Sequence, residues 1–201
     1  MNKLFLSKEF FIARGGERDC YHHPSDSSKV IKVIYKNDKN HRNQNNLEYK
    51  YLNFLKNLKV PFTQITKCYG YIDTNFGKGL VYDKICDFNG KISIPFLDIV
   101  MEEKLSKNIQ DMLVSELKNY ILENNILFVD IGLYNILCCE YEKEKYKLII
   151  IDGLGGRRPG LKFWLYLNSR MFTKYKVMRS WKRFEKELDR KRSQIKKRSS
   201  I

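Results

Sequence analysis

Three apolar runs in the second half of the chain, each adjoined by a polar residue, constrain the fold more than any other feature. The first run ends at Asp130, the second follows Asn135, and the third ends at Asp152. Strands that end on polar residues place those side chains at one edge of a core, so we expect these three to converge. One carboxylate that orients an attacking oxygen, with two oxygen ligands for Mg²⁺, is the set that phosphoryl transfer from ATP requires.

A β-hairpin with no chemical role is the alternative interpretation of this stretch. Residues 140–147 are mostly charged and separate the second apolar run from the third, as a hairpin turn would. Asp and Asn also favour strand ends, and Gly often follows them in turns. The rest of the chain has to decide between the two interpretations.

Size and composition indicate one domain or two small lobes. The chain has 201 residues, of which 43% are hydrophobic, so it can bury a sizeable core. No apolar stretch approaches the roughly 18 residues of a membrane span, and residues 1–10 lack the features of a signal peptide. The five cysteines form no CxxC pair, so neither a zinc site nor a disulfide framework is indicated. We therefore expect a reduced, cytoplasmic protein.

The positive charge is concentrated near the C-terminus. The net charge is +15, and residues 157–201 hold 16 Lys or Arg against 3 Asp or Glu, which is +13, so the other 156 residues carry +2. A basic segment of this kind attracts nucleic acid, anionic lipid head groups or acidic proteins. Residues 189–201 are almost all Lys, Arg, Ser and Gln, and we expect them to be disordered.

The first half of the chain predicts strands around a glycine turn, followed by a helix. Lys32 interrupts the β-branched run 30–35, and it lies either on the solvent face of an amphipathic strand or against phosphates. Gly15 and Gly16 in the preceding hairpin would let backbone amides approach such phosphates. Glu48 adjoins the apolar stripe of the helix expected over 43–59, where it is either a surface residue or an ion-pair partner of Lys32.

The later elements alternate in the same way. Strands are expected over residues 66–73 and 79–85, with a turn at 87–91 that could connect two lobes. Ser106 is a typical N-cap for a helix that reaches about residue 123. Beyond Asp152, the spacing of apolar residues predicts a helix over residues 177–188.

The order of these parts resembles the protein-kinase-like fold: glycine turn, strand lysine, helix glutamate, hairpin, helix, Asp-x4-Asn, strand, Asp-Gly. More closely, residues 4–185 resemble the YrbL family of bacterial proteins, whose members are kinase-like and are associated with the PhoP regulatory network. The motifs that carry the resemblance are Cys20-Tyr21-x-His23-Pro24, Ile31-Lys32-Val33, Glu48-Tyr49-Lys50-Tyr51, Val81-Tyr82-Asp83-x-Ile85-x-Asp87-Phe88-x-Gly90-Lys91 and Asn135-Ile136-Leu137-Cys138.

The resemblance implies an α+β, protein-kinase-like two-lobed fold. A small β-rich N-lobe with one helix would span residues 1–86, a reduced helical C-lobe 87–188, and a basic tail 189–201. ATP and Mg²⁺ are the implied cofactors.

The resemblance also implies roles for single residues. Gly15 and Gly16 would form the phosphate loop, Lys32 would contact the α/β-phosphates, and Glu48 would hold Lys32 from the helix. The positions that resemble the hinge, whose backbone would hydrogen-bond adenine, are Tyr82, Asp83 and Ile85. The catalytic aspartate and the two Mg²⁺ ligands would be Asp130, Asn135 and Asp152.

Several positions depart from the kinase pattern. Ala13 and Arg18 stand where the first and third glycines of the phosphate loop would be, and Arg18 there would either clash with a nucleotide or grip it. Gly132 replaces a lysine that is common in protein kinases, and no Ala-Pro-Glu motif follows Asp152. These departures disfavour phosphorylation of the eukaryotic protein-kinase type, and the pattern Asp-x-Gly-x-x-Asn from Asp130 to Asn135 also resembles that of the small-molecule and lipopolysaccharide-sugar kinases of the wider fold.

Three hypotheses follow. The first is an ATP- and Mg²⁺-dependent phosphotransferase that acts on a sugar, lipid-linked or protein hydroxyl, with the basic segment holding it peripherally at the anionic inner membrane. The second is a nucleotide-binding pseudokinase that works as a regulatory binding module. The third is a nucleic-acid-binding protein that uses the basic C-terminal segment.

Overall fold

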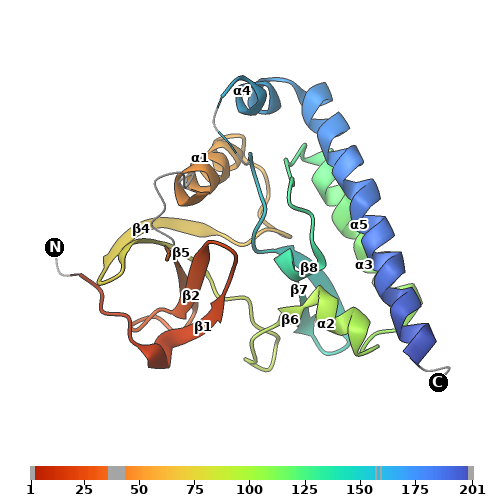
Figure 1. Cartoon of the computed structure of the whole chain (residues 1–201), viewed down its shortest axis with the longest axis horizontal. Coiled ribbons are helices and arrows are strands. Elements are labelled where there is room, and N and C mark those ends of the chain that lie inside the picture. The colour runs from red at the N-terminus through yellow and green to blue at the C-terminus, as the bar shows by residue number, and fades with distance from the viewer. Residues whose placement is uncertain (1–2, 36–43, 157, 159, 199–201) are drawn as a thin grey trace.

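The computed structural model describes residues 3–35, 44–156, 158 and 160–198. These residues form a mixed α+β fold with two antiparallel sheets and several helices (Figure 1). No helix in these ranges is both long enough and apolar enough to span a bilayer.

The first sheet has five strands in the order β1-β2-β3-β5-β4. The 3-10 turn Lys8–Phe10 leads into its strands, which are β1 (Phe11–Arg14), β2 (Arg18–His22), β3 (Lys29–Ile34), β4 (Cys68–Thr74) and β5 (Gly77–Asp83). Lys32 on the central strand β3 lies opposite Cys20 of β2 and Leu80 of β5. Because Val30, Ile31, Lys32 and Val33 are all buried, Lys32 does not lie on a solvent face.

Helix α1 (Gln44–Asn57) packs beside this sheet, within the range 43–59 expected from the sequence. Its apolar stripe includes Leu47, Tyr51 and Leu55, which are all buried. The hydroxyl of Tyr51 also accepts a hydrogen bond from Leu127 N at 2.5 Å. That bond ties α1 to the first of the three apolar runs.

The second sheet has the order β6-β7-β8, with β6 (Ile94–Pro95), β7 (Ile136–Glu142) and β8 (Lys145–Ile150). The second and third apolar runs form β7 and β8, paired with Ile136 opposite Ile150. The turn expected at 87–91 joins the two sheets, and it is closed by Asp87 N, which donates to Lys91 O at 2.8 Å.

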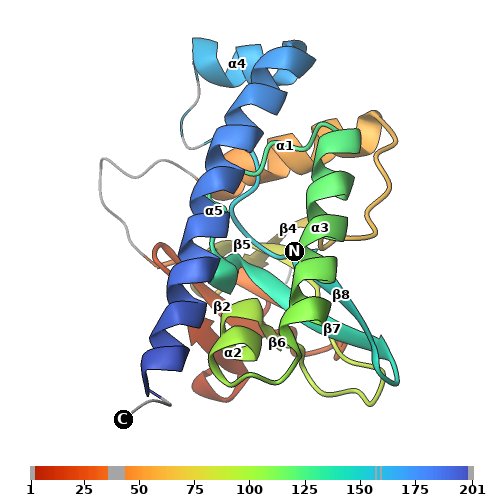
Figure 2. The same ribbon diagram turned by 90° about the vertical axis from the view of Figure 1, so that its right-hand side faces the viewer.

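Helices α2 (Phe96–Met101), α3 (Lys107–Glu123), α4 (Leu161–Asn168) and α5 (Arg170–Arg198) complete the fold. The predicted N-cap of α3 is confirmed, because Ser106 Oγ accepts a hydrogen bond from Ile109 N. Helix α3 packs against β8 of the second sheet, and α5 packs against α3 and α2 (Figure 2).

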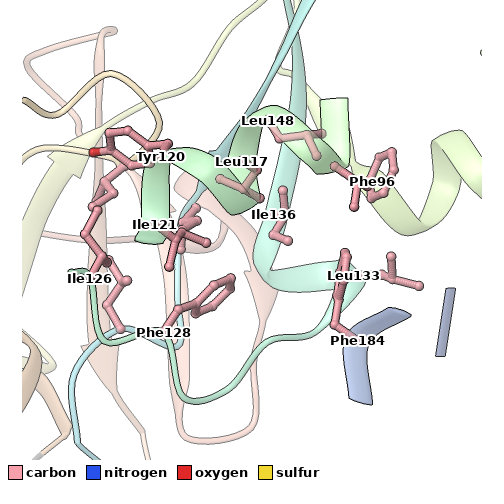
Figure 3. Packing of buried hydrophobic residues seen from close by; sticks show 14 of the residues in the cluster. Phe96, Leu117, Tyr120, Ile121, Ile126, Phe128, Leu133, Ile136, Leu148 and Phe184 are labelled. Carbon is pink, nitrogen blue, oxygen red and sulfur yellow. The ribbon is translucent and has the colours of Figure 1, made fainter. Parts of the chain in front are cut away.

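The larger of two hydrophobic clusters among the described residues, the main core, joins these elements. Side chains of α3 and α5 meet those of α2, the first apolar run, the 3-10 turn Leu133–Asn135 and the second sheet (Figure 3). The labelled members of this core are Phe96, Leu117, Tyr120, Ile121, Ile126, Phe128, Leu133, Ile136, Leu148 and Phe184.

The prediction that residues 189–201 are disordered is wrong for residues 189–198, which extend α5 to Arg198, and residues 199–201 lie outside the described ranges. Tertiary contacts explain the difference. Arg192 donates from Nε to Gln110 Oε1 at 3.0 Å and lies 2.7 Å from Asp111 Oδ1. Ile195 packs against the main core. Composition alone could not reveal that α3 supplies these partners.

Candidate functional site

Lys32 is anchored to the segment that follows β8. Its Nζ donates to Ile151 O at 2.5 Å, lies 3.7 Å from Asp152 Oδ2, and stands 4.9 Å from the centre of the Tyr82 ring. A buried ammonium requires such partners, because an unpaired charge away from water is strongly unfavourable. Lys32 therefore links the central strand of the first sheet to the polar residue that ends the third apolar run.

Glu48 is held by Arg18. Arg18 Nη1 lies 2.6 Å from Glu48 Oε2, and their side chains are only 5% and 3% exposed. The glutamate expected to hold Lys32 is thus bound to an arginine from β2. Asn45, one helical turn before Glu48, joins the pair, because its Oδ1 accepts from Arg18 Nη1 at 3.1 Å.

Arg18 also reaches Asp152, so one guanidinium bridges two carboxylates. Arg18 Nη2 lies 2.6 Å from Asp152 Oδ1. Burial alone would lower the pKa of Arg18, but the two carboxylates raise it well above its ordinary value. Burial likewise opposes ionisation of Asp152, yet Lys32 and Arg18 hold the pKa of that carboxyl well below its usual range. Asp152 is therefore an anion at neutral pH.

Asp130 and Asn135 lie beside the same segment. Asn135 Nδ2 donates to Asp130 O at 2.8 Å, and Ile151 N donates to Asn135 O at 2.9 Å. Asp130 N in turn donates to Gly153 O at 3.2 Å. The convergence expected from the sequence is therefore present in the backbone contacts that join the regions around these polar residues.

Gly153 permits the close approach of the two loops. Its φ is +85°, and a Cβ at this position would lie 2.7 Å from Asp130 O. The left-handed backbone and the lack of space both favour glycine. Gly153 is therefore required for the close tertiary contact with Asp130.

Asn135 and Asp152 offer an amide oxygen and a carboxylate, which are ligand types that Mg²⁺ accepts beside water and phosphate oxygens. The amide nitrogen of Asn135 already donates a hydrogen bond to Asp130 O, so this residue would offer its amide oxygen as the ligand. Asp152 would add a carboxylate oxygen, and Mg²⁺ typically takes only one or two protein ligands beside water and phosphate oxygens. Within the described part of the chain, no three His, Cys, Asp or Glu side chains cluster closely enough to bind a metal by themselves.

The predicted phosphate loop is the turn between β1 and β2. Gly15 N donates to Arg18 O at 2.8 Å, and Tyr35 Oη donates to Gly15 O at 3.1 Å and to Gly16 O at 3.0 Å. A Cβ on Gly16 would meet nothing within 4 Å, so space does not require glycine there. The loop leads directly into Arg18, whose side chain turns inward to Glu48 and Asp152.

The predicted adenine-binding segment makes several internal bonds. Asp83 N donates to Lys67 O at 3.1 Å, and Ile85 O accepts from Ser93 N at 3.1 Å. The Asp83 carboxylate accepts from Lys29 Nζ at 2.5 Å. Tyr82 is buried beneath Lys32. Adenine bound at this segment would compete with these backbone bonds.

Two of the clustered residues, Arg18 and Asn45, were not predicted from the sequence as site residues. Arg18 stood out only as a departure from a glycine pattern, and Asn45 was not singled out at all. The available signal for Asn45 was its spacing, since residues three apart on a helix share a face and Asn45 precedes Glu48 by three. No local pattern marks Arg18, because its partners are 30 and 134 positions away.

All residues of this site lie within the part of the chain that matches one protein family. The family model described as PhoP regulatory network protein YrbL matches residues 4–189. Two similar relatives are the uncharacterized protein YrbL of Escherichia coli strain K12 and that of Shigella flexneri. Each is 29% identical to this chain over 152 residues, which cover 75% of this chain and 72% of the relative.

Proposed function

This chain belongs to the family of the PhoP regulatory network protein YrbL, and we propose that it is an ATP- and Mg²⁺-dependent phosphotransferase with a two-lobed, protein-kinase-like fold. One observation carries the proposal. Lys32 on the central strand contacts the Ile151–Asp152 segment, which is itself bonded to Asn135 and, through Gly153, to Asp130. The five-stranded sheet meets the second half of the chain at this contact between Lys32 and the Ile151–Asp152 segment. This supports our proposal of an N-lobe over residues 1–86 and a C-lobe over residues 87–188.

Each clustered residue has a role in this proposal. Lys32 binds the α/β-phosphates, and Asp130 orients the hydroxyl of the acceptor for attack. Asn135 and Asp152 hold Mg²⁺, which would neutralise charge on the transferring phosphoryl group when bound. Catalysis then depends on positioning and on charges that are already fixed before the substrate arrives. The acceptor carries a hydroxyl group on a sugar, a lipid or a protein.

Arg18 has a separate role, because it competes with the metal. It occupies Asp152 Oδ1, the oxygen that also accepts from Gly153 N at 2.7 Å. Loading of Mg²⁺ requires Arg18 either to leave this oxygen or to share Asp152 with the ion. Glu48 offers Arg18 an alternative anion at the same distance, so Arg18 can remain paired while it releases Asp152.

A second candidate function rests on the same contact. If Arg18 stays on Asp152, the arginine replaces the metal as the cation of the site, and the protein binds a nucleotide without transferring phosphate. The short Arg18–Asp152 distance of 2.6 Å favours this regulatory alternative. Dependence of nucleotide binding on Mg²⁺ distinguishes the two functions.

The test is ATP binding and turnover with and without Mg²⁺, in the wild type, Asp130→Asn and Asp152→Asn. We expect slow Mg²⁺-dependent phosphate release that both substitutions abolish, because they remove the group that orients the nucleophile and a metal ligand. Asp189→Asn, on the exposed surface of α5, is the matched control and should behave as the wild type.

Two outcomes would contradict the phosphotransferase. Metal-independent ATP binding without phosphate release, in the presence of sugar and protein acceptors, would favour the pseudokinase. Absence of nucleotide binding under every condition would refute both candidate functions.

A further inference from the structure

A long stretch of the chain carries only positive charge. Residues 153–184 contain nine Lys or Arg and no Asp or Glu. Within this stretch, residues 161–168 form α4 and residues 170–184 form the first half of α5; α4 lies above α1 in Figure 1, and α5 begins beside it, away from the strands β1 and β2. Figure 2 shows α4 and the start of α5 projecting beyond the helices α1 and α3.

Large apolar side chains are exposed in the same stretch. No residue of α4 is buried, and its large apolar side chains Leu161 and Trp164 are 74% and 57% exposed. On α5, Met171 is 82% exposed and Tyr175 is 65% exposed, with Met178 a further three residues on at 39%. The spacing i, i+4, i+7 places these three on one face of the helix.

The exposed face of α5 differs from its buried face. Val177 and Trp181 are 2% and 1% exposed and pack into the main core, so the helix is anchored while Met171, Tyr175 and Met178 face outward. Helix α4 is held against α5 by a stack between Tyr166 and Phe172, whose ring centroids are 5.2 Å apart. The exposed side chains therefore sit on a fixed frame.

Helix faces that combine Lys or Arg with Trp, Leu and Met are typical of helices that lie in the interface of a membrane. We propose that α4 and the first half of α5 dock on an anionic lipid bilayer. The docking surface consists of the exposed apolar residues Leu161, Trp164, Met171, Tyr175 and Met178 with the exposed cations Lys162, Lys174, Arg179 and Lys182. Anionic head groups match the charge, and the acyl region accepts the apolar side chains.

Two other occupants fit the surface less well. A second copy of this chain would bring two patches without a single carboxylate face to face, and like charges repel. A nucleic acid would satisfy the cations and could stack on Trp164 and Tyr175, but it offers no hydrocarbon to Leu161 and Met171. The docking surface does not use the nucleotide site, so it stands independently of the phosphotransferase proposal.

The test is co-sedimentation of the full chain with vesicles of phosphatidylglycerol and phosphatidylcholine at 1:1, and with phosphatidylcholine alone. We expect binding only to the anionic vesicles, weakened by salt. Tryptophan emission gives a second readout, because Trp164 is exposed whereas Trp181 is buried. Insertion of Trp164 should shift the emission to shorter wavelength, and Trp164→Phe should abolish the shift.

Paired variants separate the apolar and charged contributions. Met171→Ser/Tyr175→Ser/Met178→Ser should lose most vesicle binding and the emission shift. Lys174→Gln/Lys182→Gln should lower the partition coefficient about 25-fold, at about fivefold per cation removed. The matched controls are Met112→Ser, a 52% exposed methionine on α3, and Lys78→Gln, an exposed lysine on β5. Both should bind as the wild type.

Several outcomes would overturn the proposal. These are no binding to anionic vesicles, equal binding to both vesicle types, or unchanged binding by the triple serine variant. A dimer in sedimentation equilibrium that the triple variant abolishes would identify a second copy as the occupant. Binding of a single-stranded oligonucleotide, together with no binding to anionic vesicles, would identify nucleic acid as the occupant.

Discussion

Replacement of Arg18 with methionine should destabilise the protein strongly, because it leaves Glu48 buried without its cation. The two charges are 2.6 Å apart with side chains 5% and 3% exposed. At an effective dielectric constant near 20, Coulomb attraction across that distance is about 6 kcal/mol. Removal of one member of such a pair typically lowers the free energy of unfolding by about 3–5 kcal/mol. We expect Arg18→Met to fall in this range.

The double variant Arg18→Met/Glu48→Leu isolates the cause. It removes both charges, so the desolvated carboxylate is no longer present and most of the lost stability should return. Asp152 should contribute little to the loss, because it keeps Lys32 at 3.7 Å and its side chain is 30% exposed. Glu48→Leu alone should destabilise less than Arg18→Met, since Arg18 then retains Asp152 at 2.6 Å.

Urea denaturation followed by fluorescence measures these effects, because the buried Trp181 becomes exposed on unfolding. Lys145→Met is the matched control: it removes a cation 2.9 Å from Glu142, but the side chains are 56% and 61% exposed. Exposed pairs of this kind contribute at most about 1 kcal/mol. The reasoning is refuted if Arg18→Met is no more destabilising than Lys145→Met, or if the double variant is as unstable as Arg18→Met.

Two further predictions concern the segment after β8. Gly153→Ala should lower the free energy of unfolding by more than the about 1–2 kcal/mol that a left-handed backbone costs, because the added Cβ would also meet Asp130 O. The control is Gly90→Ala, since Gly90 has φ +82° but no atom within 4 Å of an added Cβ. Equal melting temperatures of the two variants would contradict this prediction. Asp152 has a lower pKa in the folded than in the unfolded state, so its contribution to stability is present above about pH 4 and is lost as pH falls further. Between pH 5 and pH 2, the urea midpoint should therefore fall less in Asp152→Asn than in the wild type. Parallel pH profiles of the two proteins would contradict this prediction. Burial raises the pKa of Glu48, so the pH dependence of stability that Glu48 contributes has the opposite sign.

The local elements could be predicted because their signals are local. The β-branched run around Lys32 forms β3, and the apolar runs after Asn135 and before Asp152 form β7 and β8. Ser106 caps α3 as its position before an apolar stripe indicates. Each of these depends on alternation, spacing or a single cap, which neighbouring residues determine.

The partners of buried charges could not be predicted in the same way. Lys32 and Glu48 were expected to pair, yet Arg18 from β2 holds the glutamate, while Lys32 turns to Ile151 and Asp152. Ion pairing depends on which side chains the packed core brings within a few ångströms. Composition does not reveal such contacts either. For this reason residues 189–198, whose composition resembles that of a disordered tail, were not predicted to belong to α5.

The sequence by itself determined the mixed α+β class, most of the strands and helices in their order, and the concentration of positive charge near the C-terminus; it also singled out Lys32, Asp130, Asn135 and Asp152 as candidate site residues. The tertiary structure alone decided that Arg18 bridges Glu48 and Asp152, and that α4 and α5 leave apolar side chains exposed among cations. The physical reason is range: backbone preferences act over a few residues, whereas desolvation and ion pairing depend on neighbours that only the folded core supplies.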